Sequence, residues 1–348
     1  MLLADVLLYR SVWIGISMII VVIYHLSIPP TNIYYNFLIA NAHTAISICI
    51  FASGIGCYLS YSQDYDQLRF IKRRCLRVLP SYWCHLFFWF IFHFSLQAPV
   101  PFLSVLGNIF CEQYFIGVYP MQNWYIHSIW LFYMATPVFT QILDSISSYL
   151  TFALFFLFIF FLSLPFQQNL RYSIAFSRLC TYLIGMFVGK LRKLDKTITH
   201  SANLFLVASL LFGLILDLIL PLSIIDTRKH PEFLWYLPTI IVPAICILLS
   251  YLCMFLQRIY PGRFFISLFS LIGQYSLEVY LTHMLLFNIC STLIRSRIVP
   301  DTSFYWGVAV FLIFPASVFL HRMGHYTRWY GSQLIGSIRV RVKMAREF

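Results

Sequence analysis

Long apolar segments recur along the whole chain, and short polar connections separate them. Each segment has about the length that an α-helix needs to cross the hydrocarbon core of a bilayer. The pattern therefore predicts an all-α integral membrane protein with about ten transmembrane helices, and not a soluble protein with one anchor. The expected spans are residues 12–26, 36–61, 82–96, 124–143, 150–164, 179–191, 204–220, 235–256, 264–289 and 306–319.

Composition agrees with this class. The chain has 348 residues, of which 60% are hydrophobic and only 10% are charged, well outside the range of soluble domains. The first apolar segment follows Met1 with almost no basic residues and no small-residue cleavage site, so we expect a retained span and not a signal peptide. We expect one transmembrane bundle over residues 1–325 and a basic cytoplasmic tail at the membrane surface over residues 326–348.

The distribution of Lys and Arg predicts the orientation. With the N-terminus in the cytoplasm, 18 of the 24 Lys and Arg residues fall on the cytoplasmic side. The positive-inside rule requires such an excess, so both termini are predicted to be cytoplasmic. The six basic residues assigned to the outer side are Arg171, Arg178, Arg228, Lys229, Arg295 and Arg297.

The formal net charge of +12 does not indicate nucleic-acid binding. The basic residues lie on short cytoplasmic connections and on the tail, where anionic lipid headgroups attract them. The nine cysteines include no CxxC pair and lie mostly inside spans, so we expect neither a metal site nor a disulfide framework.

The densest basic cluster precedes the third span, in the stretch FIKRRCLRVLPSYW and the preceding Arg69. On a helix, Arg69, Arg73 and Arg77 share one face with Arg74 beside them, so we expect the segment to lie along the membrane surface with its apolar side down. Guanidinium groups bind phosphate with two parallel hydrogen bonds. Two interpretations stay open: an orientation anchor and a phosphate-binding site.

Ionisable residues inside predicted spans are candidates for function because a charge in hydrocarbon is costly. His25 stands out because its span, WIGISMIIVVIYHL, is otherwise apolar. It lies 15 residues beyond Arg10, about 22 Å along a helix. A cofactor headgroup at the basic cluster would need a long arm to reach it, as coenzyme A has. Imidazole also suits proton removal from a hydroxyl near neutral pH.

Other polar residues are candidates for contact with a second substrate. Asn123, Trp124 and His127 open the fourth span from the outer side, and Glu278 and His283 lie in GQYSLEVYLTH. For His85 and His93 a structural role is favoured, because a neutral histidine needs only one hydrogen bond. The longest outer connections, at residues 97–123 and 221–234, are further candidates for this contact.

Four stretches resemble the acyltransferase 3 family of membrane O-acyltransferases. They occur in the family's order and are SMIIVVIYH ending at His25, SICIFASGIGCYLSYS, FIKRRCLRVLPSYW, and IGQYSLEVYLTH ending at His283. The resemblance implies a ten-helix core in the cytoplasmic membrane of a bacterium. It also implies acyl-CoA, most often acetyl-CoA, as a cytoplasmic co-substrate without a permanently bound cofactor, and transfer to a hydroxyl of a surface glycan or glycolipid.

Residue roles follow from the same resemblance. His25 matches the family's histidine, a base or acyl relay, and Arg74 and Arg77 match its R-x-x-R, thought to hold CoA phosphates. We add Arg73 and Lys72 to that phosphate site.

Family members usually carry an arginine eleven residues before the histidine, where this chain has Ile14. Arg10, one turn earlier on the same helix face, is the candidate to replace it in the catalytic site. A donor is needed for the developing oxyanion, and Arg10, Ser53 or Asn123 could supply it.

Two other classes of protein compete with an acyltransferase. A multi-pass transporter or flippase of a glycan or acyl precursor could relay protons through Glu278, Asp217 and the histidines. A non-catalytic membrane scaffold would leave the ordered motifs unexplained.

Overall fold

The structure is a computed structural model, and it describes residues 2–26, 42–96, 100–111, 113–116, 123–219, 232–296, 298 and 303–344. Over these ranges the chain is helical, apart from connections and one isolated bridge between Leu2 and Thr197. The described part contains nine helices that are long and apolar enough to cross a membrane, and a shorter apolar helix at His200–Leu216. The all-α membrane class is therefore confirmed.

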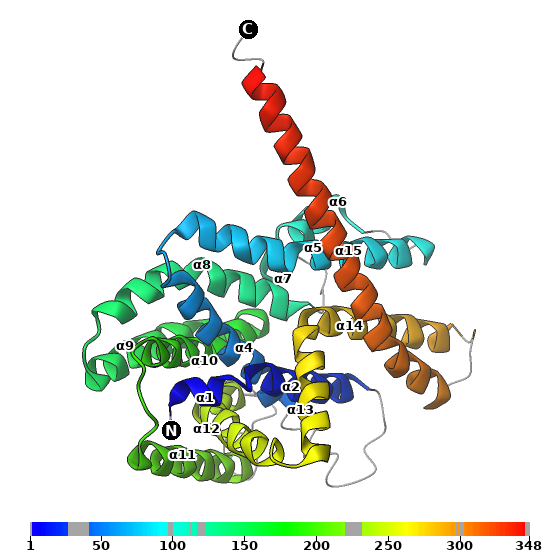
Figure 1. The fold of residues 1–348 in the computed structure, drawn as a ribbon. Helices are drawn as coiled ribbons and strands as arrows, with labels where there is room; N and C mark the ends of the chain where they lie inside the picture. The colour runs from blue at the N-terminus through cyan, green and yellow to red at the C-terminus, as the bar shows by residue number, and fades with distance from the viewer. Residues whose placement is uncertain are drawn as a thin grey trace.

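The helices pack as one bundle (Figure 1). Those that match the predicted spans are α1 (Leu3–Leu7) with α2 (Arg10–His25), α4 (Ala42–Tyr61), α5 (Gln67–Ser95), α8 (Trp124–Ser145), α9 (Tyr149–Ser163) with the 3-10 helix η1 (Leu164–Gln168), α10 (Leu170–Lys193), α11 (His200–Ile219), α12 (Glu232–Leu256), α14 (Ser276–Arg295) and α15 (Ser303–Met344). The additional helices are α6 (Phe102–Ile109), α7 (Gln113–Ile116) and α13 (Tyr260–Gln274).

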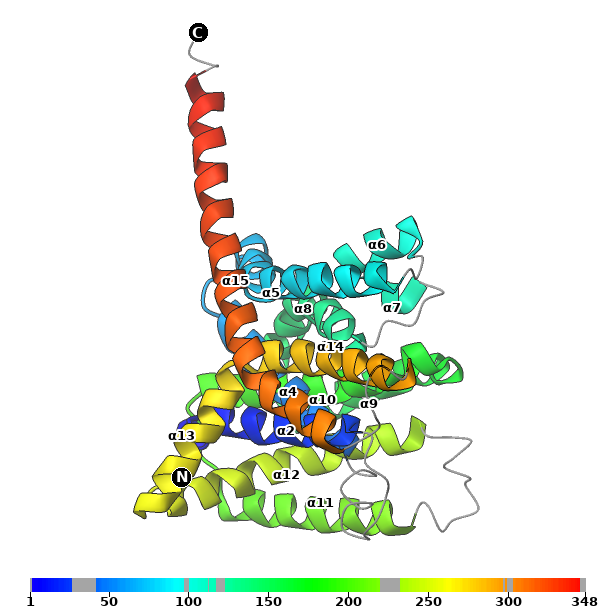
Figure 2. The ribbon, with the colours of Figure 1, turned by 90° about the vertical axis from the view of Figure 1, so that its right-hand side faces the viewer.

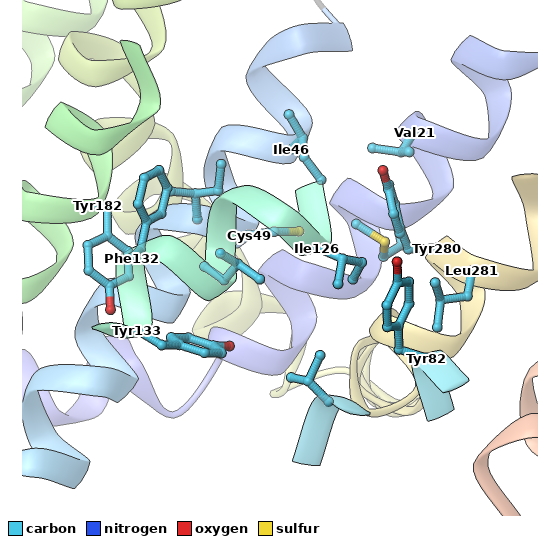
Figure 3. Packing of buried hydrophobic residues seen from close by; sticks show 14 of the residues in the cluster. Val21, Ile46, Cys49, Tyr82, Ile126, Phe132, Tyr133, Tyr182, Tyr280 and Leu281 are labelled. Carbon is cyan, nitrogen blue, oxygen red and sulfur yellow. The ribbon is translucent and has the colours of Figure 1, made fainter. Parts of the chain in front are cut away.

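Helix α4 lies at the centre and contacts α2, α8, α10 and α12. Its closest approach is to α10, where Cβ atoms built on Gly54 and Gly185 would lie 2.3 Å from the Tyr182 carbonyl oxygen and 2.2 Å from that of Phe51. Only glycine allows the two backbones to come so near. Figure 3 shows part of the surrounding core, to which α5, α8, α10 and α14 contribute aromatic side chains.

The span predicted at 264–289 is divided in the structure. Helix α13 ends at Gln274, α14 begins at Ser276, and only α14 has the length and composition of a membrane span. Helix α13 instead runs across α2 (Figures 1 and 2). Glycines make this crossing possible, because a Cβ on Gly273 would lie only 1.9 Å from the Ser11 carbonyl oxygen.

The basic cluster is not a surface segment separate from the third span. Both belong to the 29-residue helix α5, which continues through Pro80. The reason is that Phe70 is fully buried and packs against the ring of Tyr61, with ring centroids 5.5 Å apart. Phe70 and Val78 are therefore buried in the bundle, whereas Leu68 is 83% exposed.

If the shorter apolar helix α11 crosses the membrane together with the nine candidate spans, both ends of the bundle lie on the same membrane side, and the Lys and Arg pattern predicts that this side is the cytoplasm. We call the opposite end, where α2 ends and α8 begins, the outer end. Helix α15 continues without a break past residue 326 to Met344 and extends beyond the bundle (Figure 2).

Candidate active site

Three arginines share one cavity toward the end of the bundle that is predicted to be cytoplasmic. The cavity has a volume of about 80 Å³, and Arg10, Arg74 and Arg77 line it together with Ile14 and Ser53. Arg10 comes from the first residue of α2, while Arg74 and Arg77 lie one turn apart on α5. The structure thus brings the family's R-x-x-R residues to the same space as Arg10 and Ile14.

The geometry of the cavity depends on Gly56 of α4. Arg74 is buried and donates from Nη2 to the Gly56 carbonyl oxygen at 3.1 Å. A Cβ on Gly56 would lie 2.9 Å from Nη1 of Arg10, so the guanidinium of Arg10 occupies the space that a side chain would fill. Rings of Phe70 and Tyr133 lie 5.0 and 5.5 Å from Cζ of Arg74 and hold that guanidinium in place.

No carboxylate neutralises this arginine cluster in the part of the chain that the structure describes. The Nε atom of Arg74 is buried there without a hydrogen-bond acceptor. Arg74 is thus a buried charge with an unused donor, and Arg10 and the more exposed Arg77 line the same cavity, so an anion bound among them would be stabilised. The cavity therefore has the chemistry of a site for phosphate or a similar oxyanion.

The remaining predicted phosphate ligands lie elsewhere. Arg73 donates to the Asp64 carboxylate at 3.1 Å and to the Ser60 carbonyl at 3.0 Å, and Arg69 donates to Asp64 at 3.4 Å. The hydrogen bond from Arg73 holds the pKa of Asp64 below its ordinary value. Lys72 is exposed and does not line the cavity. Arg69 and Arg73 are therefore engaged by Asp64, and of the arginines predicted to share one helix face only Arg77 lines the cavity.

Histidines gather toward the outer end. His25, His127 and His283 each place Nδ1 against the backbone carbonyl four residues earlier, at 2.8, 2.8 and 3.0 Å. A carbonyl only accepts, so Nδ1 carries the proton and Nε2 holds the lone pair in each ring. The rings of His25 and His283 lie 5.1 Å apart between centroids. Nε2 of His283 and of His127 is buried without a hydrogen-bond partner among the described residues.

Asn123 connects a fourth histidine to this group. Its Nδ2 donates to Nε2 of His85 at 3.2 Å, and its carbonyl accepts from His127. His85 is fully inside the bundle, so it belongs to the histidine group and not only to the packing of α5. We use the name "histidine group" for His25, His85, His127 and His283.

Two tyrosines separate the arginine cavity from the histidine group. Tyr125 lines the cavity and packs on Tyr280 with ring centroids 5.1 Å apart. Tyr280 in turn contacts His283 with centroids 5.6 Å apart. The two candidate half-sites are thus connected through an aromatic layer.

Ser53 and Glu278, which the sequence suggests as residues of the substrate site, do not lie in the histidine group. Ser53 lines the arginine cavity. The Glu278 carboxylate is buried, accepts from Ser81 at 2.8 Å and lies 3.0 Å from Nδ1 of His321, which joins α14 to α5 and α15. Arg10 lines the same cavity as Ile14, the position where family members usually carry an arginine, and it lies at the opposite end of α2 from His25. A catalytic role for Arg10 stays a prediction.

Sequence reasoning overlooked Arg178, which was assigned to an outer connection. The structure buries it inside α10, with 3% of its surface exposed. The rule that marks ionisable residues inside spans would have found it. In the described part of the chain, no group of three His, Cys, Asp or Glu residues could hold a metal ion.

The structure is that of a multi-pass helical membrane protein with an arginine-lined cavity toward one end of the bundle and a histidine group toward the other. The chain belongs to the acyltransferase 3 family, because the family model described as "Acyltransferase domain" matches residues 15–322. It is therefore a membrane acyltransferase. Comparison with curated proteins and with solved structures gave no match. The family match begins one residue after Ile14, so it does not include Arg10.

Proposed function

We propose that the protein is an acyl-CoA-dependent O-acyltransferase of a bacterial cytoplasmic membrane. The donor, acetyl-CoA in the first place, binds from the cytoplasm, and the acceptor is a hydroxyl of a surface polysaccharide or glycolipid. The observation that carries this proposal is the arginine cavity, which holds three guanidinium groups and no carboxylate at the predicted cytoplasmic end.

Arg10, Arg74 and Arg77 would bind a phosphate of CoA. The cavity, of about 80 Å³, has room for a phosphate-sized group. Planar guanidinium forks match the oxygen spacing of phosphate. Arg73 and Lys72 lie outside this site and contribute charge only to its surroundings.

The distance between the half-sites agrees with a long thioester arm. Met18 lines the cavity, and His25 lies seven residues further along α2, about 10 Å at 1.5 Å per residue. On α14, Leu277 lines the cavity and His283 follows six residues later, about 9 Å away. The arm would have to pass the Tyr125–Tyr280 layer to bring the thioester to His25.

His25 would act as the base. Its Nε2 takes the proton of the acceptor hydroxyl, the hydroxyl oxygen forms a bond to the thioester carbonyl carbon, and the carbon–sulfur bond breaks. The departing thiolate then receives the proton. Asn123 and His283 would orient the acceptor. Asn123 is also the candidate in the outer half to donate a hydrogen bond to the developing oxyanion.

Glu278, one of the residues that a transporter would use as a proton relay, lies in a contact between helices. The intramembrane Glu278 is hydrogen-bonded to Ser81 and His321, and it does not line the cavity. A carboxylate in such a contact stabilises helix packing more readily than it relays protons.

Transfer of radiolabelled acetyl groups tests the proposal. Membranes containing the protein are incubated with labelled acetyl-CoA and the host's surface glycans, and label in the glycan fraction is counted. We expect transfer by the wild type and by His93→Ala, whose ring packs on Trp89, and none by His25→Ala. Transfer that survives in His25→Ala would contradict the mechanism, and no label with any acyl-CoA would favour transport.

A further inference from the structure

Arg178 is a buried charge that has no counter-ion among the residues that the structure describes. Its Nη1 donates to the Ile174 carbonyl at 3.0 Å and reaches the Ser177 hydroxyl at 3.5 Å, while Nε has no acceptor. No ion pair to a carboxylate is present among the described residues. Such a group inside a membrane bundle is costly, and part of its hydrogen-bonding capacity is unused.

Aromatic side chains surround the guanidinium. Its Cζ lies 4.9 Å from the ring centre of Trp124 and 5.9 Å from that of Trp235. The phenols of Tyr114 and Tyr24 are near enough to interact with it electrostatically. Indole faces attract a cation but carry no full negative charge, so they orient the guanidinium without neutralising it.

The position of Arg178 relates it to the histidine group and not to the arginine cavity. Trp124 follows Asn123, which bonds to His85, and Tyr24 precedes His25 in α2. Arg178 itself lies in the outer part of α10, eight residues after the first residue of that helix. An anion bound here would thus lie in the same outer half of the bundle as the histidine group and not at the arginine cavity.

We propose that Arg178 binds an oxyanion of the acceptor, and that the acceptor is therefore an acidic glycan or glycolipid. This inference rests on the proposed function and adds the chemical class of its acceptor. A sugar carboxylate and a phosphate linked to the sugar share the chemistry that a guanidinium fork recognises. The two sources are distinguished by the experiment.

Binding of small sugars by the full-length protein in lipid nanodiscs tests the inference without requiring acyl transfer. The probes are methyl glucuronide, which carries a carboxylate, glucose 1-phosphate, and neutral methyl glucoside, with binding followed by saturation-transfer NMR. We expect one charged sugar to bind at least about tenfold more tightly than methyl glucoside, as for one charged hydrogen-bonded contact. The sugar that shows the preference identifies carboxylate or phosphate as the source.

Variants link the preference to the residue. Arg178→Gln is expected to abolish it and Arg178→Lys to retain part of it. Arg171→Gln removes an equal charge two turns further out on α10 and is expected to leave the preference unchanged. Equal binding of the charged and neutral sugars by the wild type, or a preference that survives in Arg178→Gln, would overturn the inference and leave Arg178 with a structural role only.

The donor half-site is measured in the same nanodiscs. Acetyl-CoA binding that depends on Arg74 reports on the proposed function, whereas sugar binding that depends on Arg178 reports on the acceptor class. If acetyl-CoA binding is absent while the Arg178-dependent sugar binding is present, only the acyl-CoA donor is refuted. The opposite result refutes only the acidic acceptor.

Discussion

Replacement of Gly56 by alanine should displace Arg10 from the arginine cavity without unfolding the protein. The new Cβ would lie 2.9 Å from Nη1 and 3.6 Å from Cζ of Arg10, whereas comfortable contacts between such atoms are about 3.5–4.0 Å. The guanidinium must therefore move by about 0.5–1 Å or turn away. Alanine is a better helix former than glycine by about 1 kcal/mol, and it keeps the carbonyl that accepts from Arg74.

The size of the effect follows from the lost contact. A hydrogen bond to a charged group contributes about 1.5–3 kcal/mol, which corresponds to about a 10- to 150-fold change in Kd. Because the long Arg10 side chain can partly adjust, we expect Gly56→Ala to weaken acetyl-CoA binding by about tenfold, at the lower limit of that range. Arg10→Ala should cost at least as much.

Equilibrium binding of acetyl-CoA to the detergent-solubilised protein is the assay. Gly307→Ala is the matched control, since a Cβ at Gly307 meets no atom within 4 Å. In a double-mutant cycle, Gly56→Ala should add little to Arg10→Ala, because both remove the same contact. An unchanged Kd in Gly56→Ala, or fully additive effects of the two substitutions, would refute the role given to Arg10.

Three further results are expected. Arg74→Ala should weaken acetyl-CoA binding much more than Arg73→Ala, because of these two residues only Arg74 lines the cavity. The Kd of acetyl-CoA at two salt concentrations measures this difference, and equal losses of affinity would contradict the assignment. Gly273→Ala should lower the free energy of unfolding by about 1–3 kcal/mol, because its Cβ would lie 1.9 Å from the Ser11 carbonyl oxygen. The thermal midpoint should therefore be lower than that of Gly307→Ala. An unchanged midpoint would show that α13 does not cross α2 so closely. The pKa of Asp64, measured by NMR, should lie below 3.8. Because the pKa is depressed, the contact with Arg73 stabilises the fold at pH values above 3.8, and this stabilisation is lost as the pH falls through the folded-state pKa. A pKa at or above 3.8 would exclude that contact.

The membrane spans could be predicted from the sequence because they depend on local composition and length. Among the described residues, nine predicted spans correspond to helices that could cross a membrane and the one at 204–220 to a shorter apolar helix. The span predicted at 264–289 is misplaced because two helices follow each other directly there. A single residue, Tyr275, separates α13 from α14, and no polar connection marks the break. The crossing of α13 over α2 depends on Gly15 and Gly273, which are 258 positions apart, so no local pattern indicates it.

The candidate site was predictable in its residue types and less so in its grouping. Helical periodicity places Arg69, Arg73 and Arg77 on one face, but it cannot show that Asp64 draws two of them away. Arg10 was proposed to replace the arginine missing at Ile14, but only the structure shows that Gly56 on another helix leaves the space for its guanidinium, in the cavity that Arg74 also lines. Contacts between different helices determine these side-chain positions, and the periodicity of a single helix gives no information about such contacts.

The central claim is that the arginine cavity binds the acyl donor while His25 performs the transfer. Measuring the Kd of acetyl-CoA and the rate of label transfer in the same preparation of each variant tests it most directly. We predict that His25→Ala keeps the wild-type Kd and loses transfer, whereas Arg74→Ala raises the Kd by about tenfold or more and regains part of its transfer rate at high acetyl-CoA concentration. Transfer at the wild-type rate in His25→Ala, or an unchanged Kd in Arg74→Ala, would contradict the claim.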